Sequence, residues 1–314
     1  MTRKRIADTG LGAVAASVFG PLARDGETQE LGDARRNAAG GEFADLGLGT
    51  VHYQIDGPEH GQRVALVNGF AAPMFTWDAV FEALAHAGFR VLRFDLYGRG
   101  LSDRPTDVDY DPDLYDTQLD ELLGALGWTG RVHLAGLSMG GAIAIEYAAR
   151  RPQRVASLVL FDPAGFPVNM PAAARLLTAP LLGEVLVHIF GDRVIRQNLG
   201  KNFHNPSLLP AFIERFEPQM KIVGFKYAQL STLRHMPLSE MADRYRAVGK
   251  TDIPVLLVWG RQDRVVPYAN AALIQRAIPN CRLLTVEECG HTPNYEKPQD
   301  VIPPMLDFLA ANAK

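Results

Sequence analysis

Residues 131 to 147 read RVHLAGLSMGGAIAIEY and place one serine, Ser138, between Gly136 and Gly140. The apolar run before the serine predicts a buried strand, and the Ala- and Ile-rich segment after it predicts a helix. A Gly-x-Ser-x-Gly turn between a strand and a helix is a sharp corner that needs small residues, because the two backbones approach closely. The pattern predicts that Ser138 is a nucleophile at the carboxyl end of a sheet, and a plain strand–helix turn is the alternative.

A serine hydroxyl is a weak nucleophile until a neighbouring base removes its proton. Among the eight histidines, we predict that His291 is this base. It lies in the stretch VEECGHTPNYEKPQ, on a loop that begins at Gly290 after the last predicted strand, so it reaches the same sheet edge as Ser138. His133 lies within the strand that leads to Ser138 and is predicted to pack inside the sheet. The remaining histidines belong to an early strand, a turn, a surface helix or a long helical region: His52, His60, His86, His188, His204 and His235.

The imidazole of such a base needs a carboxylate, which fixes its tautomer and stabilises its charged form. Asp263 follows the hydrophobic run in LLVWGRQDRVVP, at the same predicted edge of the sheet. Asp162 follows the run LVLF and also ends a predicted strand, so it is the second candidate. We predict that Asp263 is the acid partner of His291, with Asp162 as the alternative.

Acyl transfer also needs hydrogen-bond donors that face the oxygen on which negative charge develops. The backbone N–H of Met139, directly after Ser138, is one predicted donor. The loop GFAAP after the strand RVALVN supplies the other, the backbone N–H of Phe70. The alternative for this loop is an ordinary glycine turn that carries an exposed aromatic side chain.

The segment DLYGRGLSDRP combines glycines with charged residues after another predicted strand. We interpret it as a structured turn held by ion pairs among Asp95, Arg99 and Asp103. A phosphate-binding loop is disfavoured, because no Lys-Ser or Lys-Thr opens a helix after it. No dinucleotide Gly-x-Gly-x-x-Gly pattern follows the first strands, and no His, Cys, Asp or Glu cluster has metal-ligand spacing. The sequence therefore predicts no cofactor and no metal.

From about residue 50 the chain alternates strand-like and helix-like segments. The strand candidates are TVHYQID, RVALVN, RVLRFD, RVHLAG, VASLVLF, IPVLLVWG and CRLLTVE, and the helix candidates cover about 76–87, 112–126, 140–151, 268–278 and 298–312. This alternation predicts an α/β fold, with a mostly parallel central sheet flanked by helices. The turn DGPEHG joins the first strand directly to the second, which predicts an antiparallel pair at an edge of the sheet.

The alternation breaks between about residues 163 and 250, where Pro and Gly separate apolar helical segments and no good strand occurs. We predict three regions: an N-terminal arm at 1–45, a core formed by 46–162 and 251–314, and a helical cap at 163–250. The cap offers apolar side chains as potential pocket lining, namely Leu181, Leu182, Phe190, Phe203, Phe212, Phe216 and Met220. Such a lining favours a medium acyl or aromatic group over a sugar or a phosphate.

The motifs NGF, DLYGRGLSD, GLSMGG, WGRQDRVVP and GHTPNYEKP occur in this order between about residues 50 and 312. With them the chain resembles the α/β-hydrolase superfamily, and most of all the capped bacterial serine hydrolases, which include esterases, monoacylglycerol-type lipases and C–C bond hydrolases. The resemblance implies a catalytic triad of Ser138, Asp263 and His291, in the order typical of that fold. It also implies that the helical cap closes over the triad.

Two positions distinguish this chain within the superfamily. Members usually have His-Gly where this chain has Asn68-Gly69, so we expect Asn68 to form a hydrogen bond in place of that structural histidine. Relatives with dehalogenase or epoxide-hydrolase activity use an aspartate as nucleophile, and the serine at position 138 disfavours both activities.

We therefore expect a serine hydrolase that cleaves carboxylic esters through an acyl-enzyme. A C–C bond hydrolase of the meta-cleavage type or an acyltransferase would use the same triad, and both stay alternatives. A ligand-binding module with this fold is the non-enzymatic alternative, although a binder has no need of nucleophile, acid and base together. The expected partner is a small-molecule ester, and both a monomer and a homodimer stay open.

The composition limits partners and location. A formal net charge of −3, with 47% hydrophobic and 21% charged residues, predicts a globular protein with no basic field for nucleic acid. Cys281 and Cys289 flank the predicted strand RLLTV, too far apart for a disulfide, so we expect free thiols in a reducing compartment. The N-terminus starts with basic residues, but Asp8 interrupts its short apolar stretch and no clean cleavage site follows. We expect a cytoplasmic protein without stable membrane insertion, and export is the minority alternative.

Overall fold

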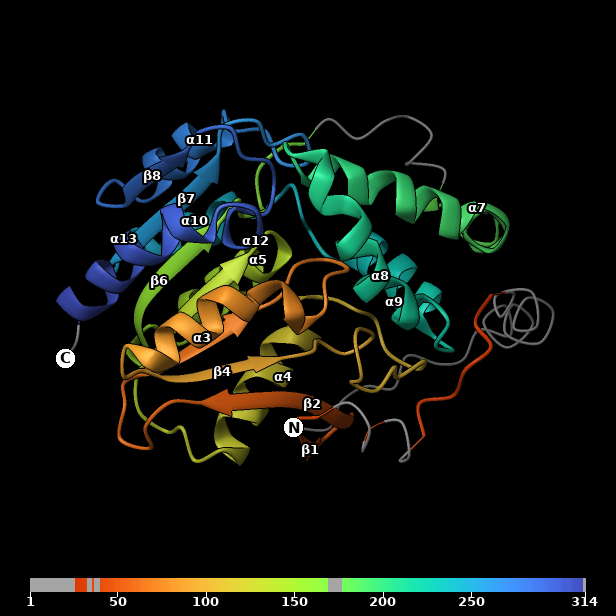
Figure 1. The fold of residues 1–314 in the computed structure, drawn as a ribbon, viewed down its shortest axis with the longest axis horizontal. Coiled ribbons are helices and arrows are strands. Elements are labelled where there is room, and N and C mark those ends of the chain that lie inside the picture. Colours follow the sequence, from red (N-terminus) through yellow and green to blue (C-terminus); the bar gives the residue numbers. More distant parts are fainter. Residues whose placement is uncertain (1–25, 33–35, 37–39, 169–176, 313–314) are drawn as a thin grey trace.

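The computed structural model places most of the chain, and Figure 1 shows how its elements are arranged. The described residues are 26–32, 36, 40–168 and 177–312. The weak export signal considered at the N-terminus, and most of the predicted arm, lie outside them. Within these described ranges, no helix is both long enough and apolar enough to cross a membrane.

One sheet of eight strands organises the molecule, in the spatial order β1-β2-β4-β3-β5-β6-β7-β8. The pairs β1–β2 and β2–β4 are antiparallel, and the remaining neighbours are parallel. The strands are β1 (Glu42–Leu46), β2 (Gly49–Asp56), β3 (Arg63–Val67), β4 (Arg90–Phe94), β5 (Val132–Leu137), β6 (Val155–Phe161), β7 (Val255–Gly260) and β8 (Arg282–Val286). All seven predicted strands are present, and the predicted α/β class with a mostly parallel sheet is confirmed.

The antiparallel end of the sheet differs from the prediction. The predicted first strand, β2, is not at the edge and does not pair with β3; it lies between β1 and β4. The reason is that β3 takes parallel partners on both sides, β4 and β5, which leaves it no free edge for β2. The true edge strand, β1, begins at Glu42 within the predicted arm, and its short sequence EFADL is too polar to stand out as a strand.

Helices cover both faces of the sheet (Figure 1). The α-helices of the core are α3 (Asp78–His86), α4 (Pro112–Ala125), α5 (Met139–Arg150), α10 (Ala242–Val248), α11 (Asn270–Ala277), α12 (Pro293–Glu296) and α13 (Pro298–Ala311). One apolar layer joins Trp77, Leu84 and Met305 to the sheet on the side of α3 and α13. The other joins Leu119 and Ile143 to it on the side of α4 and α5. All five predicted helices are found within two residues of their expected bounds or continued by a short 3₁₀ turn.

Between β6 and α10 the described residues form helices and turns, namely α7 (Leu182–Leu199), α8 (Leu209–Met220), α9 (Phe225–His235) and the 3₁₀ turns η4 (Gly200–Asn202) and η5 (Pro206–Leu208). These helices lie together on one side of the sheet, beyond the carboxyl ends of the parallel strands (Figure 1). The arm contacts them, because Gln29 forms a β-bridge with Ile222. The carboxylate of Glu27 also accepts hydrogen bonds from the backbone N–H groups of Gly224 and Lys226.

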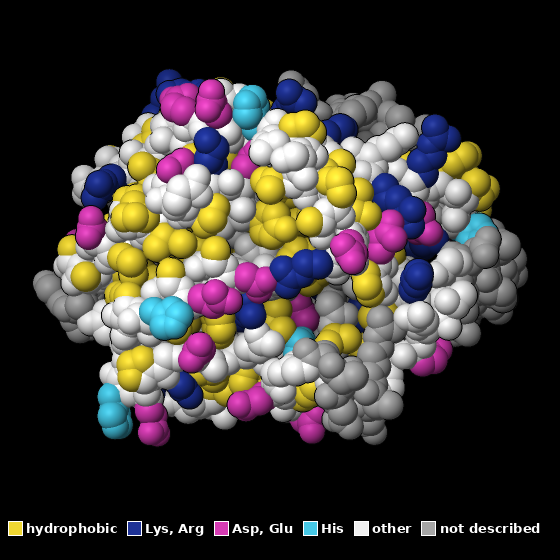
Figure 2. Space-filling model, viewed as in Figure 1, with side chains coloured by type: hydrophobic (Ala, Val, Ile, Leu, Met, Phe, Trp, Pro, Cys, Tyr) yellow, Lys and Arg dark blue, Asp and Glu magenta, His cyan; other side chains and the backbone are white. Residues whose placement is uncertain are grey.

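The surface charge follows the composition. On the face seen in Figure 2, the side chains of Lys and Arg are interspersed with those of Asp and Glu. Such a mixed surface gives no strong field of one sign on that face. Both cysteines are buried free thiols, as predicted.

Candidate active site

Ser138 occupies a sharp corner between a strand and a helix. β5 ends at Leu137 and α5 begins at Met139, while Ser138 itself has φ 55° and ψ −116°. A non-glycine residue at positive φ is strained, and such strain is concentrated at functional sites. Small neighbours are required, since a Cβ atom on Gly136 would lie 2.3 Å from the carbonyl oxygen of Gly140. The corner therefore explains the Gly-x-Ser-x-Gly pattern.

His291 and Asp263 form a close pair next to this corner. His291 Nδ1 lies 2.7 Å from Asp263 Oδ2, and both side chains are buried. Asp263 accepts two further hydrogen bonds at Oδ1, from the backbone N–H groups of Val265 at 2.7 Å and Val266 at 3.0 Å. Because a carboxylate only accepts, Nδ1 of His291 carries the hydrogen of this bond, and in the neutral imidazole Nε2 is then the nitrogen without a hydrogen.

The loop that carries His291 is fixed by contacts that sequence reasoning missed. The backbone N–H of His291 donates to the carbonyl of Asn202 at 2.7 Å. The buried carboxylate of Glu296 accepts from the N–H of Gly290 at 2.7 Å and from that of Asn205 at 2.5 Å. Glu296 therefore ties the histidine loop to the helical segment after β6. Only its place five residues after the histidine could have drawn attention to it.

Asp162, the alternative acid, lies beside Asp263 rather than beside the imidazole's hydrogen. It directly follows β6, and its Oδ1 accepts a hydrogen bond from the N–H of Gly260 at 3.0 Å. One ligand atom each from Asp162, Asp263 and His291 lie within 4.8 Å of one another. Within the described part of the chain, these three side chains form a group that could hold a metal ion. Two of them, His291 and Asp263, are already hydrogen-bonded to each other.

The two predicted oxyanion donors come from separate elements. Met139 is the first residue of α5, so its backbone N–H has no acceptor within that helix. Phe70 follows β3, and its carbonyl accepts a hydrogen bond from Arg99 Nε at 2.8 Å. As expected, Asn68 forms a hydrogen bond, from its Nδ2 to the carbonyl of Phe94 at 2.6 Å. The loop that carries Phe70 is thus fastened on both sides.

The turn DLYGRGLSDRP is structured, but the predicted ion pairs within it are wrong. Arg99 is buried and donates to the carbonyls of Phe70 and Tyr97 and to the hydroxyls of Tyr115 and Thr232. Asp95 instead pairs with His52 at 2.9 Å, and Asp103 pairs with Arg36. The acidic side chains of this turn thus find basic partners in earlier segments, and Arg99 joins the turn to the Phe70 loop and to α9.

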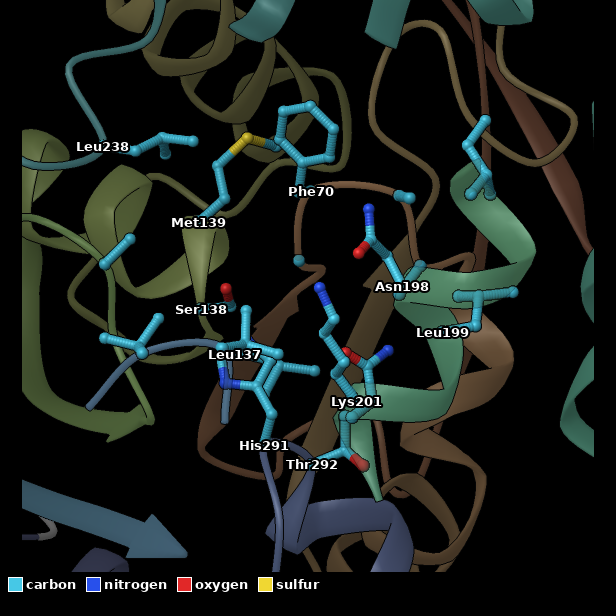
Figure 3. Close-up of a pocket in the computed structure, with 18 of the residues that line it drawn as sticks. Phe70, Leu137, Ser138, Met139, Asn198, Leu199, Lys201, Leu238, His291 and Thr292 are labelled. Atoms are coloured by element: carbon cyan, nitrogen blue, oxygen red, sulfur yellow. The ribbon is translucent and has the colours of Figure 1, made fainter. Parts of the chain in front are cut away.

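A cavity of about 450 Å³ opens between the strand ends and the helical segment. Ser138, His291, Phe70 and Met139 all border it, and Figure 3 shows these side chains among the residues that line the cavity. Its apolar wall includes Phe70, Met139, Leu199, Phe212, Phe216 and Leu238, and polar side chains on it include Asn198, Lys201, Gln229 and Arg264.

Only two of the seven cap residues proposed as pocket lining border this cavity, Phe212 and Phe216. Phe203 and Met220 are buried in an aromatic cluster behind the wall. The other three face solvent, namely Leu181, Leu182 and Phe190. The apolar pattern of a helix identifies candidate buried positions, but not the surface against which each is packed.

Residues 62–298 match the family described as the α/β-hydrolase fold. The chain is 29% identical over 276 residues to Lipase 1 of Psychrobacter immobilis, which covers 86% of this chain and 84% of that protein. It is 30% identical over 244 residues to Lipase 3 of a Moraxella species, which covers 76% and 75%. The solved structure of a thermophilic esterase from Thermogutta terrifontis matches with a TM-score of 0.73 at 25% identity, over 88% of this chain and 100% of that one.

The fold and the sequence matches agree over most of the described chain. The parallel strands and the helices between them fall within the matched region, as do Ser138, Asp263 and His291. Both similar lipases are matched over three quarters or more of their length. The chain therefore belongs to the α/β-hydrolase fold family, and it is a hydrolase that acts on ester bonds.

Proposed function

We propose that the protein is a serine hydrolase that cleaves carboxylic esters of medium-length acyl or aromatic acids through an acyl-enzyme on Ser138. The observation that carries the proposal is the 2.7 Å hydrogen bond between His291 Nδ1 and Asp263 Oδ2. It leaves Nε2 as the basic nitrogen of an imidazole that borders the same cavity as Ser138.

In the first half of the reaction, Ser138 Oγ attacks the ester carbonyl carbon while His291 Nε2 takes the hydroxyl proton. The backbone N–H groups of Met139 and Phe70 stabilise the negative charge on the carbonyl oxygen. The tetrahedral intermediate then collapses, the bond to the alcohol breaks, and the protonated imidazole gives its proton to the leaving oxygen. Asp263 stabilises the imidazolium during these steps.

In the second half, water replaces the alcohol. His291 takes a proton from this water as its oxygen attacks the acyl carbon, and the same two N–H groups stabilise the second intermediate. Its collapse releases the carboxylic acid, and His291 returns the proton to Ser138. The cycle consumes one ester and one water and forms one alcohol and one acid.

The cavity supports the proposed substrate class. Phe212, Phe216 and Leu238 offer an apolar wall that suits a hydrocarbon chain or an aromatic ring. Gln229 also borders the cavity, and neither its amide oxygen nor its amide nitrogen has a hydrogen-bond partner. A substrate with one polar group besides the scissile ester would supply that partner.

We also propose that α7, α8 and α9, which lie within the predicted cap 163–250, act as the cap, whereas α10 packs with the core. α7 contributes Ile195 and Leu199 to the cavity wall, and α8 contributes Phe212 and Phe216. These side chains lie opposite the strand ends that carry Ser138 and His291. The cap would therefore select the acyl group, whereas the strand ends perform the reaction.

A panel of p-nitrophenyl esters of increasing chain length, tested beside a vinylogous diketone, examines both function and substrate. We expect hydrolysis of the esters with an optimum at medium length. Ser138→Ala should lower kcat by at least about 10³-fold, since the nucleophile is removed. Ser207→Ala, on an exposed turn, is the matched control and should retain full activity. Faster cleavage of the diketone would favour a C–C hydrolase, and unchanged ester hydrolysis in Ser138→Ala would disprove the proposed nucleophile.

A further inference from the structure

A second buried carboxyl group lies beside the acid of the proposed triad. The Asp162 side chain is fully buried, and its φ of 43° falls in the left-handed region that Asp and Asn tolerate better than most residues. It borders no part of the cavity, whereas an oxygen of its carboxyl group lies within 4.8 Å of Asp263 and His291 ligand atoms. The reaction described above gives Asp162 no role.

The hydrogen bonds of the two carboxyl groups are unequal. Asp263 accepts three, from the ring of His291 and from the backbone N–H groups of Val265 and Val266. Asp162 accepts one at Oδ1, from the N–H of Gly260, while its buried Oδ2 has no donor. Hydrogen bonds to the charged form stabilise it, so the negative charge belongs on Asp263. An ionised Asp162 would leave a buried carboxylate oxygen unsatisfied.

Neighbouring charges act in the same direction. Burial, and then the adjacent Asp263, raise the pKa of Asp162 well above its usual value, and Glu296 on α12 adds to the effect. Cys289, on the loop after β8, is a neutral thiol, because burial raises its pKa and the adjacent Glu296 adds to the effect. Two ionised carboxylates side by side repel each other, so a second negative charge is disfavoured here, and none of these neighbours other than His291 can carry a compensating positive charge.

We propose that Asp162 is a neutral carboxylic acid whose Oδ2–H donates a hydrogen bond to the carboxylate of Asp263 and so holds it against His291. Asp162 is a positioning residue, since it acts through Asp263. Its effect on turnover rests on the proposed triad, whereas its protonation does not.

The backbone supports this positioning role. The N–H of Asp162 donates to the carbonyl of Val258 at 3.0 Å, and its Oδ1 accepts from Gly260 at 3.0 Å. Asp162 therefore links the end of β6 to the turn that carries Asp263. An asparagine at this position can keep the Oδ1 acceptor, replace the O–H donor by an N–H donor and tolerate the same φ.

The kinetic test compares Asp162→Asn with Asp162→Ala. We expect Asp162→Asn to keep kcat/KM within about threefold of wild type and to leave the acidic limb of its pH profile unmoved, because no charge is lost. Asp162→Ala, which has no donor, should lose about 10- to 100-fold in kcat. If Asp162 is ionised, Asp162→Asn removes a negative charge near the imidazole, and the acidic limb moves to lower pH by about one unit or more. That shift would overturn the proposal.

An infrared measurement tests the proton directly and does not depend on turnover. At neutral pH we expect the wild-type protein to show the carbonyl stretch of a protonated carboxyl group, and Asp162→Asn to lack it. Glu27 is another buried carboxyl group whose pKa is raised by burial, so Glu27→Gln is the matched control and should retain the band of Asp162. Identical spectra of wild type and Asp162→Asn would overturn the proposal.

Together, the infrared and kinetic measurements distinguish a failure of the Asp162 proposal from a failure of the proposed function. If Asp162→Asn does not fold, the spectrum of Glu27→Gln still decides: a remaining band supports a protonated Asp162, and its absence overturns it. If the band behaves as expected but Ser138→Ala hydrolyses esters normally, the proposed function fails while the protonation of Asp162 stands.

Discussion

The carboxyl edge of the sheet and the helical segment beyond it are built differently. At the sheet edge, Ser138, Asp263 and His291 follow three strands, and hydrogen bonds hold each of their loops. In α7, by contrast, Ile189 is 59% exposed and Phe190 is 49% exposed. Under the proposed function, the reaction depends on a rigid frame, whereas the helices over it can vary in sequence and change which substrate is accepted.

The two regions meet at one place. The carbonyl of Asn202 accepts the backbone N–H of His291, and Glu296 binds the backbone of both Gly290 and Asn205. A Cβ atom on Gly290 would lie 2.4 Å from the carbonyl oxygen of Asn202, so the contact leaves no room for a side chain. Through this contact the position of the proposed cap can affect the position of the proposed base.

The largest loss of activity should come from the sheet edge. Asp263→Asn removes the negative charge and turns an amide toward His291, which favours the wrong tautomer of the imidazole. We expect kcat to fall by about 10³- to 10⁴-fold in steady-state assays. Asp243→Asn, on the exposed surface of α10, should have no effect. A smaller loss in Asp263→Asn than in Asp162→Asn would move the acid to the end of β6.

The next largest effect should distinguish the side of the helical segment that faces the cavity from the side that faces solvent. Phe212 is buried, borders the cavity and packs edge-on against Phe75 and Tyr295. Phe212→Ala should lower the free energy of unfolding by about 3–5 kcal/mol and move the ester preference toward longer chains. Phe190→Ala, on the exposed side of α7, should stay within about 0.5 kcal/mol. Equal losses in the two variants would contradict the distinction.

The contact between the regions can be weakened through Glu296. In Glu296→Gln, the new NH₂ group faces backbone N–H donors in place of an acceptor oxygen. We expect the free energy of unfolding to fall by about 2–3 kcal/mol and kcat/KM to fall with it, measured by urea unfolding and ester hydrolysis. Glu287→Gln, which only weakens an exposed pair with Arg261, should leave stability nearly unchanged. An unchanged kcat/KM in Glu296→Gln would show that the histidine loop does not need this tie.

A further prediction is a pH dependence of stability at the sheet edge. The pKa of Asp162 is raised from 3.8 in the folded protein, so above that value the folded chain keeps a proton that the unfolded chain releases. The stability that this proton contributes is present below the unfolded pKa and is lost as the pH rises toward the folded pKa. Relative to Asp162→Asn, wild type should therefore lose up to about 1.4 kcal/mol per pH unit above about pH 4. Urea unfolding at several pH values measures this slope, and a constant difference would mean that Asp162 ionises normally.

Most of the sheet could be predicted from the sequence, because β5, β6 and β7 are buried along their whole length and read as continuous apolar runs. The antiparallel end of the sheet could not be predicted in this way. β1 is short and half exposed, and the partner of β2 is decided by the long-range pairing of β3 with β4 and β5. Local patterns do not contain that information.

Likewise, part of the candidate site could be predicted from the sequence and part could not. Strand ends and glycines indicated Ser138, Asp263 and His291, and their roles stay predictions. The partners of Arg99 and the role of Glu296 could not be predicted, since they depend on segments distant in sequence that meet only in the folded chain. The cavity lining was mostly missed for the same reason.

The most direct test of the central claim is to treat the folded protein with a fluorophosphonate and locate the adduct by peptide mass spectrometry. The proposed mechanism requires one adduct on Ser138, formed rapidly in wild type and in Ser207→Ala, and absent in Ser138→Ala. It should form far more slowly in Asp263→Asn. An ester-hydrolysing protein that carries no adduct, or carries it on another residue, would contradict the assignment of Ser138 as the nucleophile.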